Sequence, residues 1–508
     1  MRIVELAVEF APLAKAGGLG EVVTGLSSQL IRIGQKVEVI FPKYDFIDSR
    51  KLRNIKMEVP DFKCTEKRIA HANTMWSAEW EGVPLHLLEA RHPAGYFHRG
   101  KIYGCEYDIA RFLYFSRAAL EYLKLKNQPI DVLHIHDWHV AIAALMVRDL
   151  FQLPIKSILL TIHNAAYQGK CATWDLDAIG LKGANYLTKE IMQDNDSIHS
   201  KNLNILKGGI IYSDAVNAVS PTYSKELLTS AIGHGLDPTF RKIKGKLSGI
   251  LNGLELGLWD PAKDVHLAKG FKQEDSFESI FNAKAATREV LCKRFSLNQN
   301  KRPWIGAITR LVPQKGPELL EEALAQIVRL GGTFLLLGSS PTQKIQNHFE
   351  KLKQKYKDHS QVLLHFEYDD ALAHQIYAAL DFLVIPSLYE PCGLTQMIGM
   401  RYGTVPIARA TGGHKDTIFD CENPQVPFGQ CNGFLFPNFT NISLIKALER
   451  AIKTFRHAPE MIHALIQHGM KMDWSWEKPT EEYLQLFEKI TKGNVLIRGA
   501  LEAPQLSI

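Results

Sequence analysis

The sequence has few of the patterns that mark metal, redox or membrane proteins. Its seven cysteines are scattered and none forms Cys-x-x-Cys, so we expect no zinc or redox motif and no disulfide framework. No apolar run is long enough to span a bilayer. The net charge of +6 is small for 508 residues and is spread along the chain. It favours neither nucleic acid nor a membrane as a partner.

The composition is that of a globular protein with more than one domain. Hydrophobic residues make up 46% of the chain and charged residues 22%, as in soluble proteins. A chain of this length is too long for a single core. Glu5 and Glu9 interrupt the first apolar run, and a strand begins almost at once, which argues against a signal or transit peptide. With the cysteine usage, this favours a reducing, cytoplasmic compartment.

The first 50 residues predict the opening of a Rossmann-like domain. A strand over Ile3–Phe10 leads into the glycine-rich turn Lys15–Gly20 (KAGGLG), a helix to about Ile33 and a strand over Val37–Phe41. The turn lacks the full G-x-G-x-x-G pattern, so a dinucleotide cofactor is not expected. A lysine beside two glycines can still meet a phosphate or a sugar.

Two regions of the first half carry weaker signals. Residues 51–110 predict short strands and loops with six aromatic side chains, for which core packing is favoured over stacking on sugar rings. These are Trp76, Trp80, Tyr96, Phe97, Tyr103 and Tyr107. Residues 185–204 are polar and predict a mobile loop.

Polar residues follow two predicted strands of the first half. The strand Asp131–Ile135 ends in the run His136–His139 (HDWH), and the strand Ser157–Ile162 ends in His163 and Asn164. Because ligands bind at the carboxyl ends of parallel strands, this pattern favours a site there. A metal bound by His136, Asp137 and His139 is an alternative, but no second ligand set has metal spacing.

The chain restarts its alternation of strands and helices after residue 252. Glycines near Asn252 and the run Trp259-Asp260-Pro261 predict a domain boundary. We expect an N-terminal Rossmann-like domain over 1–252, a second over 253–475, and a final segment 476–508. That segment would hold a helix over Tyr483–Ile490 and a loose tail. Two such halves predict a cleft between them.

The stretch 382–413 is the strongest candidate for a binding site. A buried strand, Phe382–Ile385, leads through a turn containing Glu390 to a helix from Leu394 to about Tyr402. Glu390 would lie at a strand's carboxyl end beside a helix N-terminus that suits a phosphate. Gly393 would let the backbone approach the ligand. An ordinary turn with a solvated glutamate is the alternative reading of this spacing.

Several short motifs occur in one order over residues 1–490 and together closely resemble bacterial glycogen synthase and plant starch synthase. They are KAGGL from Lys15, HDWH from His136, TIHN from Thr161, VSPTY from Val219, GILNG from Gly249, TRL from Thr309, QKG from Gln314, PS from Pro386, EPCGLTQ from Glu390, MRYGTVP from Met400 and TGG from Thr411. Each motif alone is modest, but the ordered set is highly specific.

The resemblance implies a GT-B fold, in which two Rossmann-like domains face each other across a cleft. It also implies transfer of glucose from ADP-glucose to the non-reducing 4-OH end of an α-1,4-glucan such as glycogen, with retention of configuration and release of ADP. Neither a metal nor another cofactor is implied. The N-terminal domain would lie on the acceptor side and the C-terminal domain would hold the nucleotide sugar.

The resemblance also assigns roles to individual residues. Arg310 and Lys315 would bind the donor diphosphate, and Glu390 would contact the donor glucose. Asp137 and His163 would line the glucose site and complete the catalytic set. The donor-binding residues would be Lys15, Gly18, Asn252, Gly338, Tyr368, Gly393, Leu394 and Thr395, with Tyr368 stacking on the base.

Two positions depart from related patterns. Ile398 stands where the wider group of retaining transferases has a second glutamate, as is usual for glycogen synthases, and His414 stands where the family often has leucine. A transferase using UDP-glucose and a glucan-binding protein without activity are the alternatives. The second is disfavoured because Arg310, Lys315 and Glu390 are all present.

Overall fold

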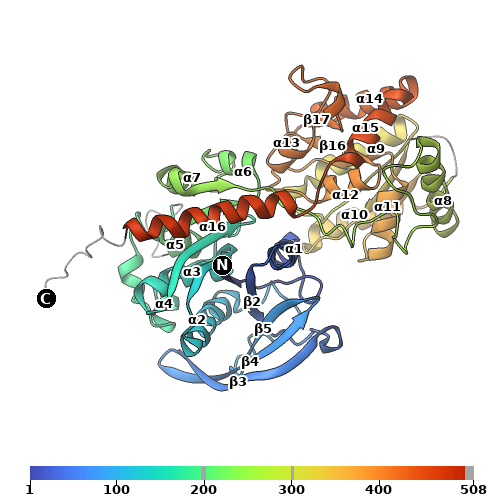
Figure 1. Cartoon of the computed structure of the whole chain (residues 1–508). Helices are drawn as coiled ribbons and strands as arrows, with labels where there is room; N and C mark the ends of the chain where they lie inside the picture. The colour runs from blue at the N-terminus through green and yellow to red at the C-terminus, as the bar shows by residue number, and fades with distance from the viewer. Residues whose placement is uncertain (196–201, 299–302, 498–508) are drawn as a thin grey trace. The chain divides into compact units, whose positions relative to one another are not determined.

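The computed structural model describes residues 1–195, 202–298 and 303–497 (Figure 1). The chain divides into two compact units. Unit 1 consists of Met1–Gly253 together with Trp476–Ile508, and unit 2 of Leu254–Ser475. Each unit is an α/β structure built around a sheet that is mainly or wholly parallel.

Unit 1 contains a nine-stranded sheet in the order β11-β10-β7-β6-β1-β2-β5-β4-β3. Its strands are β1 (Arg2–Leu6), β2 (Lys36–Pro42), β3 (Arg53–Glu66), β4 (Ile69–Trp80), β5 (Val83–Ala90), β6 (Ile130–His136), β7 (Ile155–Ile162), β10 (Ala215–Ala218) and β11 (Leu247–Gly249). The central strands are nearly continuous apolar runs that are buried on both faces, as parallel strands require.

The helices of unit 1 cover this sheet. They are α1 (Gly18–Arg32), α2 (Asp108–Lys126), α3 (Asp137–Asp149), α4 (Thr173–Ala178), α5 (Ile205–Tyr212), α6 (Pro221–Glu226), α7 (Asp237–Lys242) and α16 (Glu477–Ile497). The α6 helix begins at Pro221. The side chain of Ser220 caps it by accepting a hydrogen bond from the amide N–H of Tyr223.

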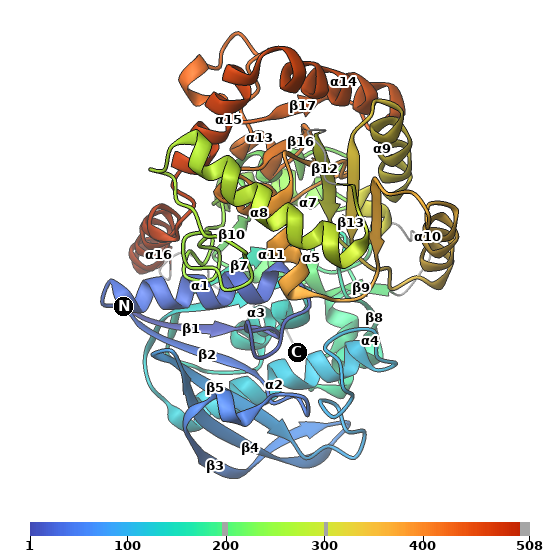
Figure 2. The same ribbon diagram turned by 90° about the vertical axis from the view of Figure 1, so that its right-hand side faces the viewer.

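The prediction for residues 51–110 is confirmed for the loop over 91–107 but was wrong for the strands before it. Instead of short strands and loops, β3, β4 and β5 form long antiparallel pairings at one edge of the sheet (Figure 2). The tight turn from β4 to β5 has positive φ at both Glu81 and Gly82, which suits a hairpin. Because β3 is largely exposed, it carries few apolar residues, and its sequence resembles a loop.

The last helix belongs to unit 1 although it follows unit 2 in the chain. It is longer than predicted: α16, drawn in red in Figure 1, covers Glu477–Ile497 rather than 483–490. Tyr483 and Phe487 are fully buried in one core cluster with residues of β1, β6 and β7. The side-chain amide of Asn217 donates to the Tyr483 hydroxyl at 2.9 Å. The tail predicted after the helix falls largely on 498–508, outside the described residues.

Unit 2 contains a six-stranded parallel sheet in the order β14-β13-β12-β15-β16-β17. Its strands are β12 (Trp304–Ile308), β13 (Thr333–Leu337), β14 (Val362–His365), β15 (Phe382–Ile385), β16 (Val405–Arg409) and β17 (Phe434–Phe436). Its helices are α8 (Phe277–Phe295), α9 (Pro317–Arg329), α10 (Gln343–Lys355), α11 (Asp370–Ala379), α12 (Thr395–Arg401), α13 (Gly413–Thr417), α14 (Asn441–His457) and α15 (Pro459–Lys471).

Both sheets have a topological switch point, where the strand order reverses. In unit 2 it lies between β12 and β15, and in unit 1 between β1 and β6. Ligands of open α/β sheets bind at this point, beyond the carboxyl ends of the strands. The loops after β1, β6, β12 and β15 carry most of the predicted site residues.

The sequence predicts no disulfide framework, but the structure has a disulfide among its described residues. Cys421 and Cys431 are bonded, with Cα atoms 5.3 Å apart. A backbone bridge between Asp420 and Gly433 closes the loop that contains them, and a spacing of ten residues gives no recognisable motif. The free cysteines are Cys64, Cys105, Cys171, Cys292 and Cys392.

The predicted loop 185–204 includes a short strand, β9 (Asn202–Asn204), which pairs with β8 (Lys170–Ala172). Residues 196–201 of this segment lie outside the described residues. Within the described part of the chain, no helix has the length and hydropathy needed to cross a membrane.

Candidate active site

A buried carboxylate forms the centre of the candidate site in unit 2. Glu390 lies in the turn between β15 and α12 and is only 5% exposed. Its Oε2 lies 2.5 Å from the Lys315 ammonium and accepts from the Ser387 hydroxyl at 2.9 Å. Burial acts to raise the pKa of Glu390, but Lys315 and then His414 outweigh it and hold this pKa below its usual value. Glu390 is therefore a charged group in a fixed position.

The backbone around Lys315 is tied to the Glu390 turn. The amide N–H of Leu388 donates to the carbonyl of Gln314 at 2.8 Å, and the Gln314 side chain donates to the carbonyl of Tyr389 at 3.2 Å. Lys315 ends a 3₁₀ turn, and the helix α9 begins two residues later. Lys315 therefore lies just before the helix and not within its first turn.

Gly316 explains how the two segments can approach so closely. Its φ is +65°, in the left-handed region that favours glycine. A Cβ atom at this position would lie 2.4 Å from the carbonyl oxygen of Pro386, which is too close for any side chain.

A second glycine turn supports Glu390 from the other side. The amide N–H of Gly413 donates to the Glu390 carbonyl at 3.0 Å. The next residue, His414, is fully buried. Its Nδ1 lies within hydrogen-bond distance, 3.0 Å, of the carbonyl oxygen of Arg409. Its Nε2 has no hydrogen-bond partner among the described residues. The family departure at His414 thus lies directly beside the site.

The other predicted residues of unit 2 follow neighbouring strands of the same sheet edge. Arg310 is exposed after β12, and its guanidinium makes no ion pair with any described residue. Gly338 directly follows β13. Its backbone lies so close to the Thr309 backbone that a Cβ atom on Gly338 would be 1.9 Å from the carbonyl oxygen of Thr309. Tyr368 follows β14 and is 89% exposed. No contact within the described residues joins Arg310 to the Lys315–Glu390 pair.

Gly393, Leu394 and Thr395 follow Glu390 directly. Gly393 has a φ of +76°, Leu394 occupies the N-cap position of α12, and Thr395 is its first residue. The three residues are half-buried, so their backbone is partly accessible.

In unit 1, Asp137 and His163 are brought together from the ends of β6 and β7. Asp137 Oδ1 accepts from the amide N–H of His163 at 2.7 Å. Asp137 has a φ of +58°, an uncommon conformation for a residue other than glycine and one that clusters at functional sites. The pKa of Asp137 is raised to about 7. Burial is the main cause and Glu9 adds to it, while the amide N–H groups of His163 and Asn164 act to lower this pKa.

The glycine-rich loop after β1 is organised by Glu9, a residue for which the sequence suggested no site role. Glu9 Oε2 accepts from the amide N–H groups of Ala16 and Gly17 at 2.7 and 3.0 Å. Lys15 and Gly18 are exposed, and the Lys15 ammonium pairs with Glu21. An acidic residue inside an apolar run was the signal that could have identified Glu9.

Asn252 follows β11 at one edge of the sheet. It is 6% exposed, and its Oδ1 has no hydrogen-bond partner among the described residues. No contact in the described structure joins it to Asp137 or His163.

Over residues 1–195, 202–298 and 303–497, two groups of His, Cys, Asp or Glu side chains have ligand atoms within 4.8 Å of one another. They are Glu5 with His134 and His136, and Glu66 with His71 and His92. In each group a histidine already lies within ion-pair distance of the carboxylate, so proximity alone assigns no metal.

The alternative set of His136, Asp137 and His139 is not such a group within the described residues. Instead, the His139 ring stacks on Tyr103 with centroids 4.9 Å apart. Burial, with a smaller effect of Arg111, lowers the pKa of His139 to about 3.

Comparison with known proteins explains this arrangement. The model of the "starch synthase catalytic domain" family matches residues 2–242, and that of "glycosyl transferases group 1" matches residues 292–472. A glycogen synthase from Protochlamydia amoebophila is 42% identical over 505 residues, which cover 97% of this chain and 100% of that protein. The chain belongs to the glycogen synthase and starch synthase family.

Plant members of the family are also similar. A probable starch synthase 4 from Arabidopsis thaliana is 40% identical over 96% of this chain, which spans 47% of that longer protein. The solved catalytic domain of Arabidopsis starch synthase IV, bound to ADP and acarbose, has a TM-score of 0.91 at 40% identity and covers 96% of this chain and 99% of its own.

A more distant structure bears only on the fold. Sucrose-phosphate synthase from Thermosynechococcus elongatus has a TM-score of 0.61 at 19% identity, over 97% of this chain and 99% of its own. The predicted GT-B class and family membership are confirmed.

Proposed function

We propose that the protein elongates an α-1,4-glucan by transferring glucose from ADP-glucose to the non-reducing 4-OH end, with retention of configuration and release of ADP. The ion pair between Lys315, in the segment after β12, and the buried Glu390 after β15 is the observation that carries this proposal. The names of the relatives and the ADP-bound solved structure support it. We also propose a cytoplasmic location.

The chemistry requires that negative charge be stabilised as it develops on the leaving diphosphate. Lys315 is suited to this because its ammonium is already fixed beside Glu390. A preorganised cation stabilises charge in the transition state without further reorganisation. Arg310 supplies a second cation, and a charge-assisted hydrogen bond from a guanidinium to phosphate is strong. Glu390 contacts the donor glucose, and no metal or other cofactor takes part in the proposed mechanism.

The rest of the donor site follows the same assignment. The backbone at Gly393, Leu394 and Thr395 binds phosphate, Gly338 allows a close approach, and Tyr368 stacks on the base. Tyr368 is 89% exposed, and an aromatic ring is suited to stacking on a base.

Unit 1 contributes the remaining residues and the acceptor side. Asp137, His163 and Asn252 line the glucose site, while Lys15 and Gly18 meet the donor. The unpaired Oδ1 of Asn252 supports this role, because a buried amide oxygen without a partner has a hydrogen bond to offer a sugar hydroxyl.

The test is a primed assay with glycogen that compares initial rates with ADP-glucose and UDP-glucose, each with and without excess EDTA. We expect faster transfer from ADP-glucose and no effect of EDTA. Equal or faster transfer from UDP-glucose would refute the donor assignment. Loss of activity with EDTA that Mg²⁺ or Mn²⁺ restores would refute the metal-free mechanism. Glucan binding without transfer from either donor would favour the non-catalytic alternative.

A further inference from the structure

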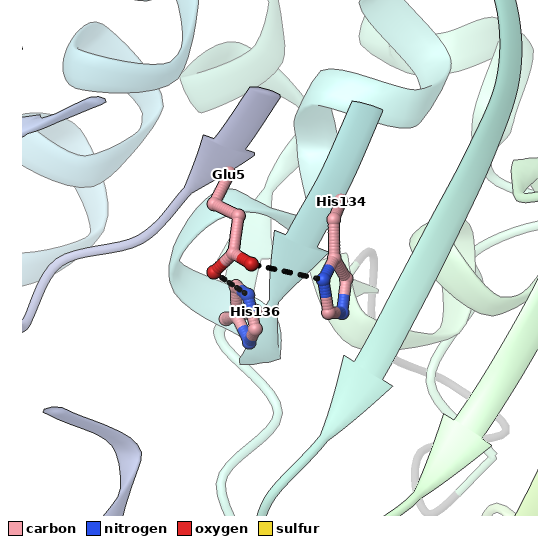
Figure 3. Close-up of side chains that lie close together, drawn as sticks. All are labelled: Glu5, His134 and His136. Carbon is pink, nitrogen blue, oxygen red and sulfur yellow. Dashed lines mark ion pairs between the residues drawn. The ribbon is translucent and has the colours of Figure 1, made fainter. Parts of the chain in front are cut away.

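A line of ionisable side chains runs from the core of unit 1 to His163. Glu5 lies on β1, His136 ends β6, and His163 follows β7. Glu5 Oε2 lies 3.4 Å from His136 Nε2, and His136 Nδ1 lies 3.0 Å from His163 Nε2. Figure 3 shows the Glu5 carboxylate facing both His136 and the neighbouring His134. The buried carboxylate is thus connected to a proposed substrate contact through one imidazole.

The strand register dictates this arrangement. Glu5 of β1 is the register partner of His134 on β6, and His136 is the partner of Thr161 on β7. Alternate residues of a strand lie on the same face, so both histidines of β6 face the side that Glu5 reaches. The position of His136 between β1 and β7 follows from the sheet order alone.

Burying the cluster of Glu5, His134 and His136 costs free energy, because it removes a charge from water. Glu5, His134 and His136 are each 0% exposed, and neither oxygen of Glu5 has a hydrogen-bond donor within the described residues. The His134 ring packs against Tyr483 and Phe487 at 5.6 and 5.7 Å. Apolar residues of similar volume would pack here without the cost of desolvating a charge. Stability therefore does not explain these residues, and a role at the adjacent site does.

The charges in the cluster follow from its contacts. Burial acts to raise the pKa of Glu5, but His134 and His136 outweigh it and bring this pKa to about 2. Burial, followed by His136, lowers the pKa of His134 to about 4, and burial lowers the pKa of His163 well below its usual value. Glu5 is thus a carboxylate with the neutral imidazole of His134 and the ring of His136 beside it, and the imidazole of His163 beyond His136 is also neutral.

We propose that Glu5, acting through His136, fixes the orientation and tautomer of His163. In this arrangement His136 is the imidazolium of an ion pair with Glu5. Its Nδ1–H donates to His163 Nε2, which leaves the proton of His163 on Nδ1, where it is a donor for the substrate. Glu5 and His136 are positioning residues, and the inference rests on the proposed function, in which His163 lines the glucose site. Asp137 fixes the backbone of His163 by accepting a hydrogen bond from the His163 amide N–H.

A double-mutant cycle tests this coupling in the full-length protein. Glu5→Gln keeps the side-chain shape and removes the charge, and His163→Ala removes the group on which Glu5 acts. We expect Glu5→Gln to lower kcat about tenfold or more, the scale for losing a partner that orients a site residue, with the KM for glycogen unchanged. In the His163→Ala background the same substitution should have no further effect.

The matched control is Glu66→Gln. Glu66 is another buried glutamate of unit 1, at 4% exposure, with His92 Nε2 at 2.9 Å and the Tyr96 hydroxyl at 2.8 Å. It lies on β3, five strands from β6 in the sheet order. Its kcat should stay within about twofold of wild type, and melting temperatures of all variants check that each is folded.

The outcomes separate this inference from the proposed function. Independent, multiplicative losses from the Glu5 and His163 substitutions would overturn the coupling alone, as would a Glu5→Gln variant that behaves like the control. Full activity of His163→Ala would overturn both the coupling and the role of His163, while transfer from ADP-glucose would still stand.

Two measurements test the proposal without a comparison of rates. Nitrogen-15 NMR of histidine-labelled protein, with His163→Ala identifying the signal, should show the Nδ1–H tautomer of His163, and the Nε2–H tautomer would contradict the proposal. Zinc at one equivalent in the purified wild type that is lost in Glu5→Gln and kept in Glu66→Gln would also overturn it, because Glu5 and His136 would then serve as metal ligands.

Discussion

Lys315 and Glu390 each balance the charge of the other. A buried carboxylate without its cation would face the desolvation cost alone, and the ammonium is held at 2.5 Å by that same carboxylate. The ion pair therefore keeps a positive charge fixed beside the Glu390 turn. A cation held in this way acts on the transition state more than on the bound donor.

This pairing gives the first prediction. Lys315→Gln should lower kcat by roughly 10²–10³, the scale for removing one preorganised charge-stabilising group. Affinity for glycogen should barely change, because the acceptor does not touch Lys315 in the proposed mechanism. Steady-state kinetics with ADP-glucose measures both effects.

Lys351→Gln is the control for this substitution, since Lys351 is exposed on α10 of the same unit. It should keep wild-type kcat. If Lys315→Gln retained more than about a third of the wild-type kcat, Lys315 would have no role in the chemistry.

Asp137 gives a prediction about stability and pH. Its pKa of about 7 in the folded protein lies above the ordinary aspartate value of 3.8, so the folded state binds more protons between these two pH values. Stability from this group is present at low pH and is lost as pH rises through 7. Asn is neutral and tolerates a positive φ. The free energy of unfolding of Asp137→Asn, taken relative to that of the wild type, should therefore increase by about 2–3 kcal/mol from pH 5 to pH 8.

Urea unfolding of both proteins at the two pH values, without substrate, measures this difference. A gap that stays constant with pH would show that Asp137 is already ionised throughout the range.

At the scale of elements, the turn at Gly412 and Gly413 positions the Glu390 segment. A Cβ atom on Gly413 would lie 1.9 Å from the carbonyl oxygen of Cys392, a backbone atom that cannot move aside alone. Gly413→Ala should therefore displace the turn that carries Glu390. We expect a loss of about 1–3 kcal/mol of stability and a fall in kcat of roughly 10²-fold, as for a misplaced catalytic group.

Gly429→Ala is the matched control, because no heavy atom lies within 4 Å of the Cβ position at this exposed glycine of unit 2. Thermal melts and kinetics of the two variants should differ clearly. Equal, near-neutral effects would show that the Gly413 turn does not hold Glu390.

The sequence predicts those elements whose signals are local. The strand Phe382–Ile385 is predicted with its observed bounds, because it is a short apolar run bounded by a change in composition. The strand β3 was missed, since its burial depends on its pairing with β4 and its own residues are mostly polar. Local pattern cannot reveal an edge strand whose partner alone stabilises it.

The same limit applies to the site. Motifs identified Lys315 and Glu390, but their contact joins residues 75 positions apart and depends on the positive φ of Gly316. The chain from Glu5 to His136 was not predicted, because it requires knowing that β1 lies beside β6. Sequence spacing identifies strand ends, while the order of the strands decides which of them meet.

At the scale of the whole molecule, unit 1 is assembled from two separate parts of the chain. Residues 1–253 form its sheet, and the segment from Trp476 onward completes its core after the whole of unit 2. A Cβ on Gly25 would lie 1.9 Å from the Trp476 indole nitrogen, so α1 and the start of the last segment are in close contact. The core of unit 1 cannot be complete until the end of the chain is in place.

The last prediction follows from this construction. Phe487 of α16 is fully buried with Ile3, Val132 and Leu159 of the three central strands. Phe487→Ala should cost about 3–5 kcal/mol, the range for removing a buried phenylalanine side chain. Amide hydrogen exchange should then show weaker protection of β1, β6 and β7, with β12, β13 and β15 unchanged, because the lost contacts all lie within unit 1. Leu125→Ala, at a side chain of α2 that is 60% exposed, should leave both sheets as they are. An equal loss of protection in both sheets would instead mean that the two units unfold as one cooperative body.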